Sequence, residues 1–200
     1  MLSNKLILSA LLLFTIMIIS CKTEVEPPPH KLFEEERLVL KTAREVLNQD
    51  VKFTSSGYFD SDTLKSIAAG IEVASRNQNG VQFFLINWVD GTFEKSYSTE
   101  ILEGSFSQCT VDKIKFGEFK NELIYFNSES YFMGSSGGET FAYIIDLKDK
   151  KVFSAHLTVA SQGLVVLELS ENVLNRTMKN FFIGFFRREY PTLSVIQPEN

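Results

Sequence analysis

The stretch at residues 77–89 reads NQNGVQFFLINWV, and it decides the fold class. Asn79-Gly80 is the dipeptide that most strongly favours a tight hairpin turn. The run from Val81 to Trp88 has the length and the aromatic and β-branched content of a buried strand. Upstream, the apolar spacing in 66–76 also fits a helix, but Gly70 weakens a helix, so we predict a strand there. The chain is therefore expected to form a β-hairpin across residues 66–88.

Strand-like runs continue on both sides of this hairpin, each bounded by turn residues. A weak run begins at Val51, and Asp90-Gly91 makes the turn that follows the hairpin. The later runs lie at 92–101, 113–119, 122–127, 140–147, 151–160 and 164–169. Short strands that alternate with turns of Gly, Asn, Asp and Lys are typical of an antiparallel meander. We predict one antiparallel, curved sheet of about seven or eight strands.

Two amphipathic helices flank the predicted strands. Over 30–48, apolar residues recur every three or four positions, and acidic residues fill the first turn, where they suit the helix dipole. Ser170 is a good N-cap, and a Phe-rich face runs from Val173 to Phe186 before Pro191 ends the helix. That face could bind a partner or lipid, but a helix that covers a sheet needs the same stripe. We therefore predict an α+β fold in which both helices pack on the sheet.

Composition indicates a packed globular chain and excludes one class of partner. The chain has 200 residues, 44% of them hydrophobic, and 18 Phe against 6 Tyr and 1 Trp. A chain of this length forms about one domain, and its Phe content predicts a large apolar core. With 20 Lys and Arg against 25 Asp and Glu, the net charge is −5. Because nucleic-acid binding needs a basic surface, we expect no nucleic-acid partner.

The first 20 residues have the anatomy of a secretory signal. Lys5 ends a short basic start, Leu6 to Ile19 is almost entirely apolar, and the small residue Ser20 precedes Cys21. The apolar run is shorter than the about 20 residues that a membrane-spanning helix needs. Ile18-Ile19-Ser20-Cys21 resembles the lipobox of bacterial lipoproteins, although that family prefers Leu at the position of Ile18. The resemblance implies cleavage before Cys21 and a lipid anchor on its thiol.

The same segment predicts where the protein is held. By the lipoprotein sorting rule, Lys22 in place of Asp implies the outer membrane. An uncleaved N-terminal anchor is the alternative, and it too would tether the protein to a membrane. Pro27-Pro28-Pro29 ends a tether that should extend as polyproline II, reaching roughly 25 Å. We expect a lipoprotein signal peptide at 1–20, a lipidated Pro-rich tether at 21–29 and a single α+β domain at 30–200.

The remaining cysteine and the histidines indicate neither a disulfide nor a metal site. With Cys21 committed to lipid, Cys109 has no partner for a disulfide, and we predict an inert, buried thiol. The two histidines are His30, next to the tether, and His156, on the polar side of a predicted strand and therefore solvated. No Cys or carboxylate cluster supplies the ligand spacing of a transition-metal site. We expect no metal and no cofactor.

Residues 60–65 begin like a calcium loop, with Asp60-Ser61-Asp62. A calcium loop of this kind needs an oxygen ligand and a glycine at the next positions, where Leu64 and Lys65 stand. We therefore predict an Asx-type turn in place of a cation site.

One motif tempts an assignment as a serine hydrolase. Gly134-Ser135-Ser136-Gly137-Gly138 matches G-x-S-x-G, and Asp146 and His156 follow in the order serine, acid, histidine. The pattern activates a serine only on a sharp strand-to-helix turn, with backbone amides forming an oxyanion hole. Here a strand-like run follows at 140–147, so we predict a connecting loop and no catalytic residue.

Three classes of function remain. We favour a non-enzymatic envelope lipoprotein that binds a partner or plays a structural part, because its placement is specified whereas catalytic groups are missing. The second class is a carrier that holds an apolar ligand or lipid between the sheet and the Phe-rich helix. The third is a serine hydrolase. An enclosed apolar cavity behind Phe181–Phe186 would favour the carrier.

Overall fold

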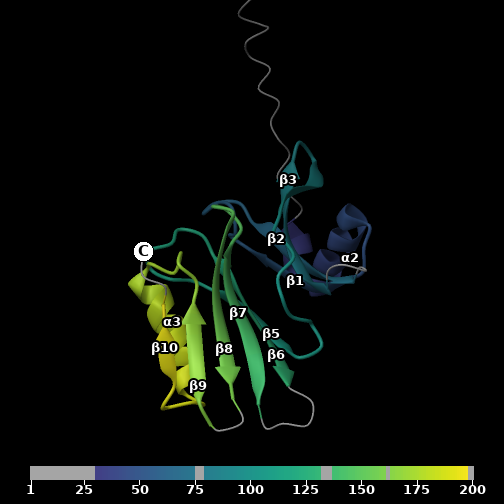
Figure 1. Ribbon diagram of the computed structural model, residues 1–200. Helices are drawn as coiled ribbons and strands as arrows, with labels where there is room; N and C mark the ends of the chain where they lie inside the picture. The colour runs from purple at the N-terminus through teal and green to yellow at the C-terminus, as the bar shows by residue number, and fades with distance from the viewer. Residues whose placement is uncertain (1–29, 75–78, 132–136, 161–162, 198–200) are drawn as a thin grey trace, which may run out of the picture.

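The computed structural model describes residues 30–74, 79–131, 137–160 and 163–197, which form two β-sheets and two α-helices (Figure 1). The smaller sheet has the order β1-β2-β3-β4, with β1 (Val51–Gly57), β2 (Ser66–Ala74), β3 (Asn79–Val89) and β4 (Thr92–Ser98). The larger sheet has the order β10-β9-β8-β7-β6-β5, with β5 (Cys109–Ile114), β6 (Leu123–Tyr131), β7 (Gly138–Asp146), β8 (Lys151–Val159), β9 (Val165–Leu169) and β10 (Ser194–Ile196). The α+β class is confirmed, whereas the prediction of a single sheet is wrong.

The N-terminal helix covers the outer face of the smaller sheet. A short 3-10 turn, η1 (His30–Glu34), leads into α2 (Glu36–Leu47), as the spacing of apolar residues predicted. The helix ends where Asn48 adopts a left-handed conformation and donates its backbone N–H to the Arg44 carbonyl at 2.8 Å. Val39 and Ala43 are buried in one hydrophobic cluster with alternate residues of β2 and β3. The first helix therefore packs on a four-stranded sheet that the sequence did not separate from the larger one.

The C-terminal helix, α3 (Arg176–Arg187), covers the outer face of the larger sheet through Met178, Phe182 and Phe186. It begins later than predicted, because Asn175 is the N-cap and accepts the backbone N–H groups of Thr177 and Met178. Ser170, predicted as the N-cap, instead exchanges two hydrogen bonds with the backbone of Ser154 in β8, each 3.0 Å long. The predicted cap thus fastens the end of β9 to its neighbour.

An aromatic cluster joins the inner faces of the two sheets. Phe83 of β3 and Phe126 of β6 are fully buried, with ring centroids 5.4 Å apart in an edge-to-face arrangement. Phe106 packs against both rings at 5.7 and 5.6 Å. The layers therefore follow the order α2, smaller sheet, larger sheet, α3, and α2 and α3 lie at opposite sides of the molecule in Figure 1.

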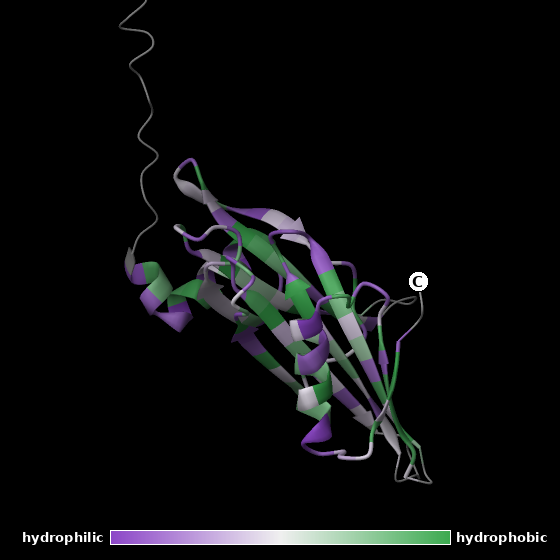
Figure 2. Ribbon diagram, turned by 90° about the vertical axis from the view of Figure 1, so that its left-hand side faces the viewer, coloured by the Kyte–Doolittle hydropathy of each residue, from purple (hydrophilic) through white to green (hydrophobic). Residues whose placement is uncertain are grey.

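This layering explains why β2 contains a continuous buried run. In β2, residues 66–71 are all buried, because alternate side chains face α2 and the larger sheet. The described members of the three hydrophobic clusters all lie between Leu32 and Val195. The hydrophobic strands and the polar turns between them are visible in Figure 2. Among the described residues, the packed interior is thus formed by residues between Leu32 and Val195.

Three local predictions differ from the structure. Asn79-Gly80, predicted as part of the turn, lies within β3, paired with Ala74 and Val73, and the rest of the predicted turn, at 77–78, lies outside the described residues. The strand predicted at 113–119 lies at 109–114, and Phe116 and Phe119 pack against the cluster beneath α3 instead. The three-residue β10, parallel to β9, was not predicted.

Phe182→Ala tests the packing of α3. Because Phe182 is fully buried beneath the helix, we expect the free energy of unfolding to fall by about 3–5 kcal/mol in urea titrations. Phe185 is half-buried, with the Arg188 guanidinium 5.1 Å above its ring, so Phe185→Ala should cost only ~1–2 kcal/mol. Equal losses for the two variants would contradict this orientation of α3.

Candidate functional site: a groove between the two sheets

The connection between β4 and β5 is fastened to the smaller sheet. Ser105 donates its hydroxyl to Oε1 of Glu72 at 2.7 Å, and the Phe106 backbone N–H donates to the same oxygen at 2.9 Å. Glu72 is near the end of β2. These two hydrogen bonds lower the pKa of the Glu72 carboxyl, because both donors stabilise its charged form. The carboxylate therefore holds the connection through charge-assisted hydrogen bonds.

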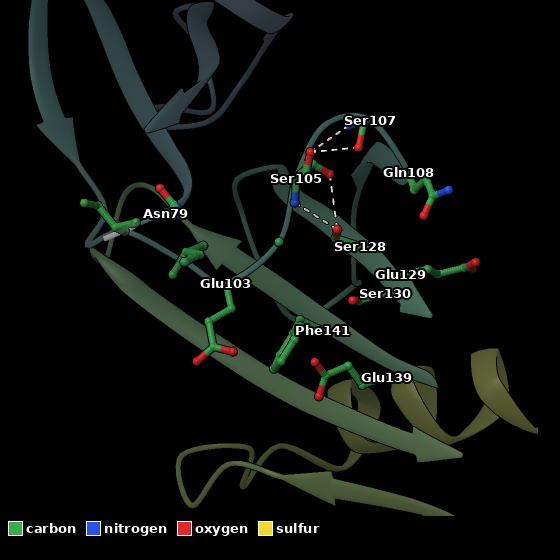
Figure 3. Close-up of a pocket in the computed structure, with 13 residues that line it drawn as sticks. Asn79, Glu103, Ser105, Ser107, Gln108, Ser128, Glu129, Ser130, Glu139 and Phe141 are labelled. Atoms are coloured by element: carbon green, nitrogen blue, oxygen red, sulfur yellow. Dashed lines mark hydrogen bonds between the residues drawn. The ribbon is translucent and has the colours of Figure 1, made fainter. Parts of the chain in front are cut away.

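The same connection is also fastened to the larger sheet (Figure 3). The Ser105 N–H donates to the Ser128 hydroxyl at 2.9 Å, and that hydroxyl donates to the Ser105 carbonyl at 3.2 Å. Gly104 has φ of 125°, and a Cβ there would come within 2.6 Å of the Ser128 Cβ. Only glycine permits this backbone conformation and this close approach together. The connection thus links β2 to β6 and fixes one wall of a groove.

The groove is open and has a volume of about 930 Å³. Its wall is the connection between β4 and β5, and its floor is formed by the ends of β6 and β7, with Phe141 at its base (Figure 3). Glu103 and Glu139 contribute carboxylates, and Ser107, Ser128 and Ser130 contribute hydroxyl groups. None of the described residues that line the groove is Lys or Arg. The groove therefore favours neutral or cationic ligands that form hydrogen bonds.

A stacked pair of rings borders the groove. Phe141 and His156 face each other across β7 and β8, with ring centroids 4.5 Å apart and ring planes nearly parallel at 4°. Nε2 of His156 lies 3.2 Å from Oε2 of Glu139, so this carboxylate and the Phe141 ring together orient the imidazole. The side chain of His156 is 35% exposed, so it is half-buried and less solvated than predicted, and its two partners were not predicted. Both partners depend on the register that pairs Asp146 with Lys151, which the turn predicted at 148–150 does not give.

The structure does not bring together the acid and histidine of the hydrolase pattern. Asp146 is buried at the end of β7 and accepts hydrogen bonds from the Asn121 side chain and the Lys148 and Asp149 backbone. His156 pairs with Phe141, five residues from Asp146 along the same strand, which corresponds to about 16 Å. Ser136 lies outside the described residues. Asp146 therefore shapes a turn and does not orient His156.

A second cavity, of about 150 Å³, lies beneath the C-terminal end of α3. Phe185, Phe186 and Tyr190 line one side, and Leu157 and Val159 of β8 line the other. This is the place where the sequence predicted that a carrier would hold its ligand. Ligand pockets usually measure about 300–1,000 Å³, so this cavity would hold only a small molecule or a few waters.

Near this cavity, burial raises the pKa of the Tyr125 hydroxyl, and Asn127 opposes the shift. That hydroxyl is buried, and no described residue forms a hydrogen bond of good geometry with it. The Phe181 and Phe185 rings each lie 5.1 Å from the Tyr125 ring. Tyr125 is therefore held mainly by aromatic packing.

The other predicted residues lie away from the groove floor. Cys109, at the start of β5, is half-buried and therefore less enclosed than predicted. Burial raises the pKa of its thiol, and the negative charge of Glu72 raises it further. The turn at 61–64 is made by the Ser61 hydroxyl, which accepts the N–H groups of Thr63 and Leu64, so a serine replaces the predicted aspartate. Asp60 instead accepts a hydrogen bond from the Asn87 side chain.

The described ranges contain neither the residue cluster of a metal site nor a membrane-spanning helix. Within them, no group of three or more His, Cys, Asp or Glu residues is placed to hold a metal ion. No helix in this part of the chain is long and apolar enough to cross a membrane. The predicted lipidation residue, Cys21, lies outside the described residues. The lipid anchor therefore stays a prediction from the sequence.

Comparison with known proteins adds no relative. No protein family model, no curated protein sequence and no solved structure matches the chain significantly.

Glu72→Gln tests the wall of the groove through its pH dependence. Because the folded-state pKa is lowered, the ionised carboxylate stabilises the protein above its unfolded-state pKa, and this stabilisation is lost as pH falls through the folded-state value. At pH 7 we expect Glu72→Gln to reduce the free energy of unfolding by about 1 kcal/mol, allowing for solvent screening. The difference from the wild type should shrink toward pH 3.

Glu171→Gln is the matched control for this comparison. Glu171 is exposed in the connection between β9 and α3, so the same change in charge should leave stability nearly unchanged across the pH range. A pH-independent loss for Glu72→Gln, or the same loss for Glu171→Gln, would show that the carboxylate of Glu72 does not hold the connection.

Proposed function

We propose that the protein is a lipoprotein anchored through Cys21 to the bacterial outer membrane, with a folded domain that binds a partner and performs no catalysis. The sequence from Ile18 to Cys21 supports the anchor, and the Pro-rich tether supports a domain that stays near its membrane. The groove supports the binding role. Its wall is fixed to both sheets, so a ligand would meet a preformed surface.

The separation of Asp146 from His156 favours binding over serine hydrolysis. A hydrolytic triad needs its acid within hydrogen-bond reach of the histidine. The carboxylate beside His156 is Glu139, which lies on the same face of the sheet, where both side chains are half-buried and reach solvent. The imidazole and its carboxylate therefore serve best as surface polar groups.

The size of the cavity under α3 favours binding over lipid transport. A carrier must enclose an acyl chain, and a cavity of about 150 Å³ is smaller than typical sites for ligands of that size. Phe182 and Phe186 fill the space between α3 and the sheet. The fixed wall of the larger groove is the single observation that carries the binding proposal.

Cys21→Ser tests the anchor, with Cys109→Ser as its control. If the lipid is attached to Cys21, Cys21→Ser should abolish metabolic labelling with palmitate and leave an unprocessed precursor, whereas Cys109→Ser should be labelled like the wild type. Density-gradient fractionation should place the labelled protein with the outer membrane. Labelling that survives Cys21→Ser would refute the anchor.

A further inference from the structure

The larger sheet extends beyond the smaller one and leaves part of its inner face uncovered. The sheet-to-sheet cluster includes residues of β6 and β7 but only Val152 from β8, and no described residue from β9 or β10. In Figure 1, β9 and β10 lie at the far side of the larger sheet from β1–β3. The opposite face of the same strands is covered by α3. Among the described residues, one half of this sheet therefore lacks the second layer that the other half has.

Apolar side chains are exposed on this uncovered face. In β9, Val165, Leu167 and Leu169 point to the cluster beneath α3, so Val166 points the other way. Leu164 lies just before β9, and its carbonyl accepts the Ala160 N–H at 2.9 Å, so the pairing with β8 continues to it and places its side chain on the face of Val166. Leu164 is 59% exposed and Val166 is half-buried. Ile196 of β10 pairs with Glu168 on the same face and is 50% exposed. Exposed large apolar residues that gather on one face are typical of a docking surface.

The charges on this face have one sign. Glu139, Glu168 and, at the adjoining groove, Glu103 contribute carboxylates, and His156 pairs with Glu139. The described positions of β8–β10 that point to this face include no Lys and no Arg. An anionic membrane surface or a nucleic acid would be repelled. A partner with Lys or Arg beside an apolar stripe would complement both the carboxylates and the exposed apolar residues.

The fold itself indicates the form of such a partner. The two outer sheet faces are each covered by an amphipathic helix, α2 on one and α3 on the other. The uncovered part of β8, from Ser154 to its end, spans about 20 Å, the length of a helix of about 13 residues. A helix is therefore the element that best fits the remaining face.

We propose that the uncovered inner face of β8–β10, with Leu164, Glu168 and Ile196, docks a basic amphipathic helix of a partner protein. This inference rests on the proposed binding function and names the chemistry of the partner. The helix would place apolar residues on Leu164 and Ile196 and its Lys or Arg residues next to Glu139 and Glu168.

The test measures peptide binding by fluorescence anisotropy, with the chain from Lys22 onward, which holds every described residue of the packed interior and needs no lipid. The probe is an 18-residue labelled peptide of Leu and Lys with an apolar face at helical spacing. One comparison peptide replaces each Lys with Glu, and another replaces each Leu with Ser. The proposal expects binding of the Leu and Lys peptide alone, weakened by added salt.

Two double variants then locate the binding surface. Leu164→Ser with Glu168→Lys changes the proposed face, and Leu174→Ser with Glu171→Lys makes the same chemical changes between β9 and α3, where Leu174 is 70% exposed. We expect the first variant to bind the peptide about tenfold more weakly and the second to bind like the wild type. Circular dichroism should show that both variants are folded.

Each other outcome overturns the proposal. If the Glu peptide binds as tightly as the Leu and Lys peptide, charge plays no part in binding. If the Ser peptide binds as tightly, apolar contact plays no part. If neither variant weakens peptide binding, or if both weaken it, the binding site lies elsewhere. If the wild-type protein does not bind the Leu and Lys peptide at all, this class of partner is excluded. If analytical ultracentrifugation shows that the wild type is a dimer and that the first variant is a monomer, a second copy of this chain covers the face instead of a partner helix. Because the peptide assay uses no lipid, its failure leaves the palmitate result on the anchor unaffected.

Discussion

The structure depends on one contact, the packing of two sheets of unequal width around buried Phe83 and Phe126. Once four strands and six strands face each other, each sheet has a second apolar face that must be covered. α2 covers the outer face of the smaller sheet and α3 covers the outer face of the larger sheet, each through its apolar side chains. The difference in width leaves the inner face of β8–β10 without a partner layer, because the smaller sheet does not reach it.

The groove is a consequence of the same arrangement. The chain has to pass from β4 in one sheet to β5 in the other, and the connection it makes is fixed to β2 through Glu72 and to β6 through Ser128. Gly104 allows the backbone to approach β6 closely enough for these hydrogen bonds. The wall of the groove thus belongs to the link between the sheets, and the acidic side chains beside it face the solvent in front of Phe141.

The sequence predicted the elements better than their arrangement. Alternation in 140–147 and 151–160 predicted β7 and β8, and helical spacing predicted α2, because these patterns are local. Alternation does not tell which sheet a strand joins, so two sheets were predicted as one; the fully buried run at 66–71 was the available signal of two covered faces. The partners of His156 and the Glu72 hydrogen bonds join distant residues, and no local pattern reveals them.

Solvent access to individual methyl groups tests the unequal sheets most directly. In a methyl-labelled sample with a soluble paramagnetic compound, we expect strong broadening of the methyl signals of Leu164 and Ile196, which are 59% and 50% exposed. Leu85 and Ile124, between the sheets and 3% and 0% exposed, should be nearly unaffected. Protection of Leu164 and Ile196 equal to that of Ile124 would contradict an uncovered half-sheet.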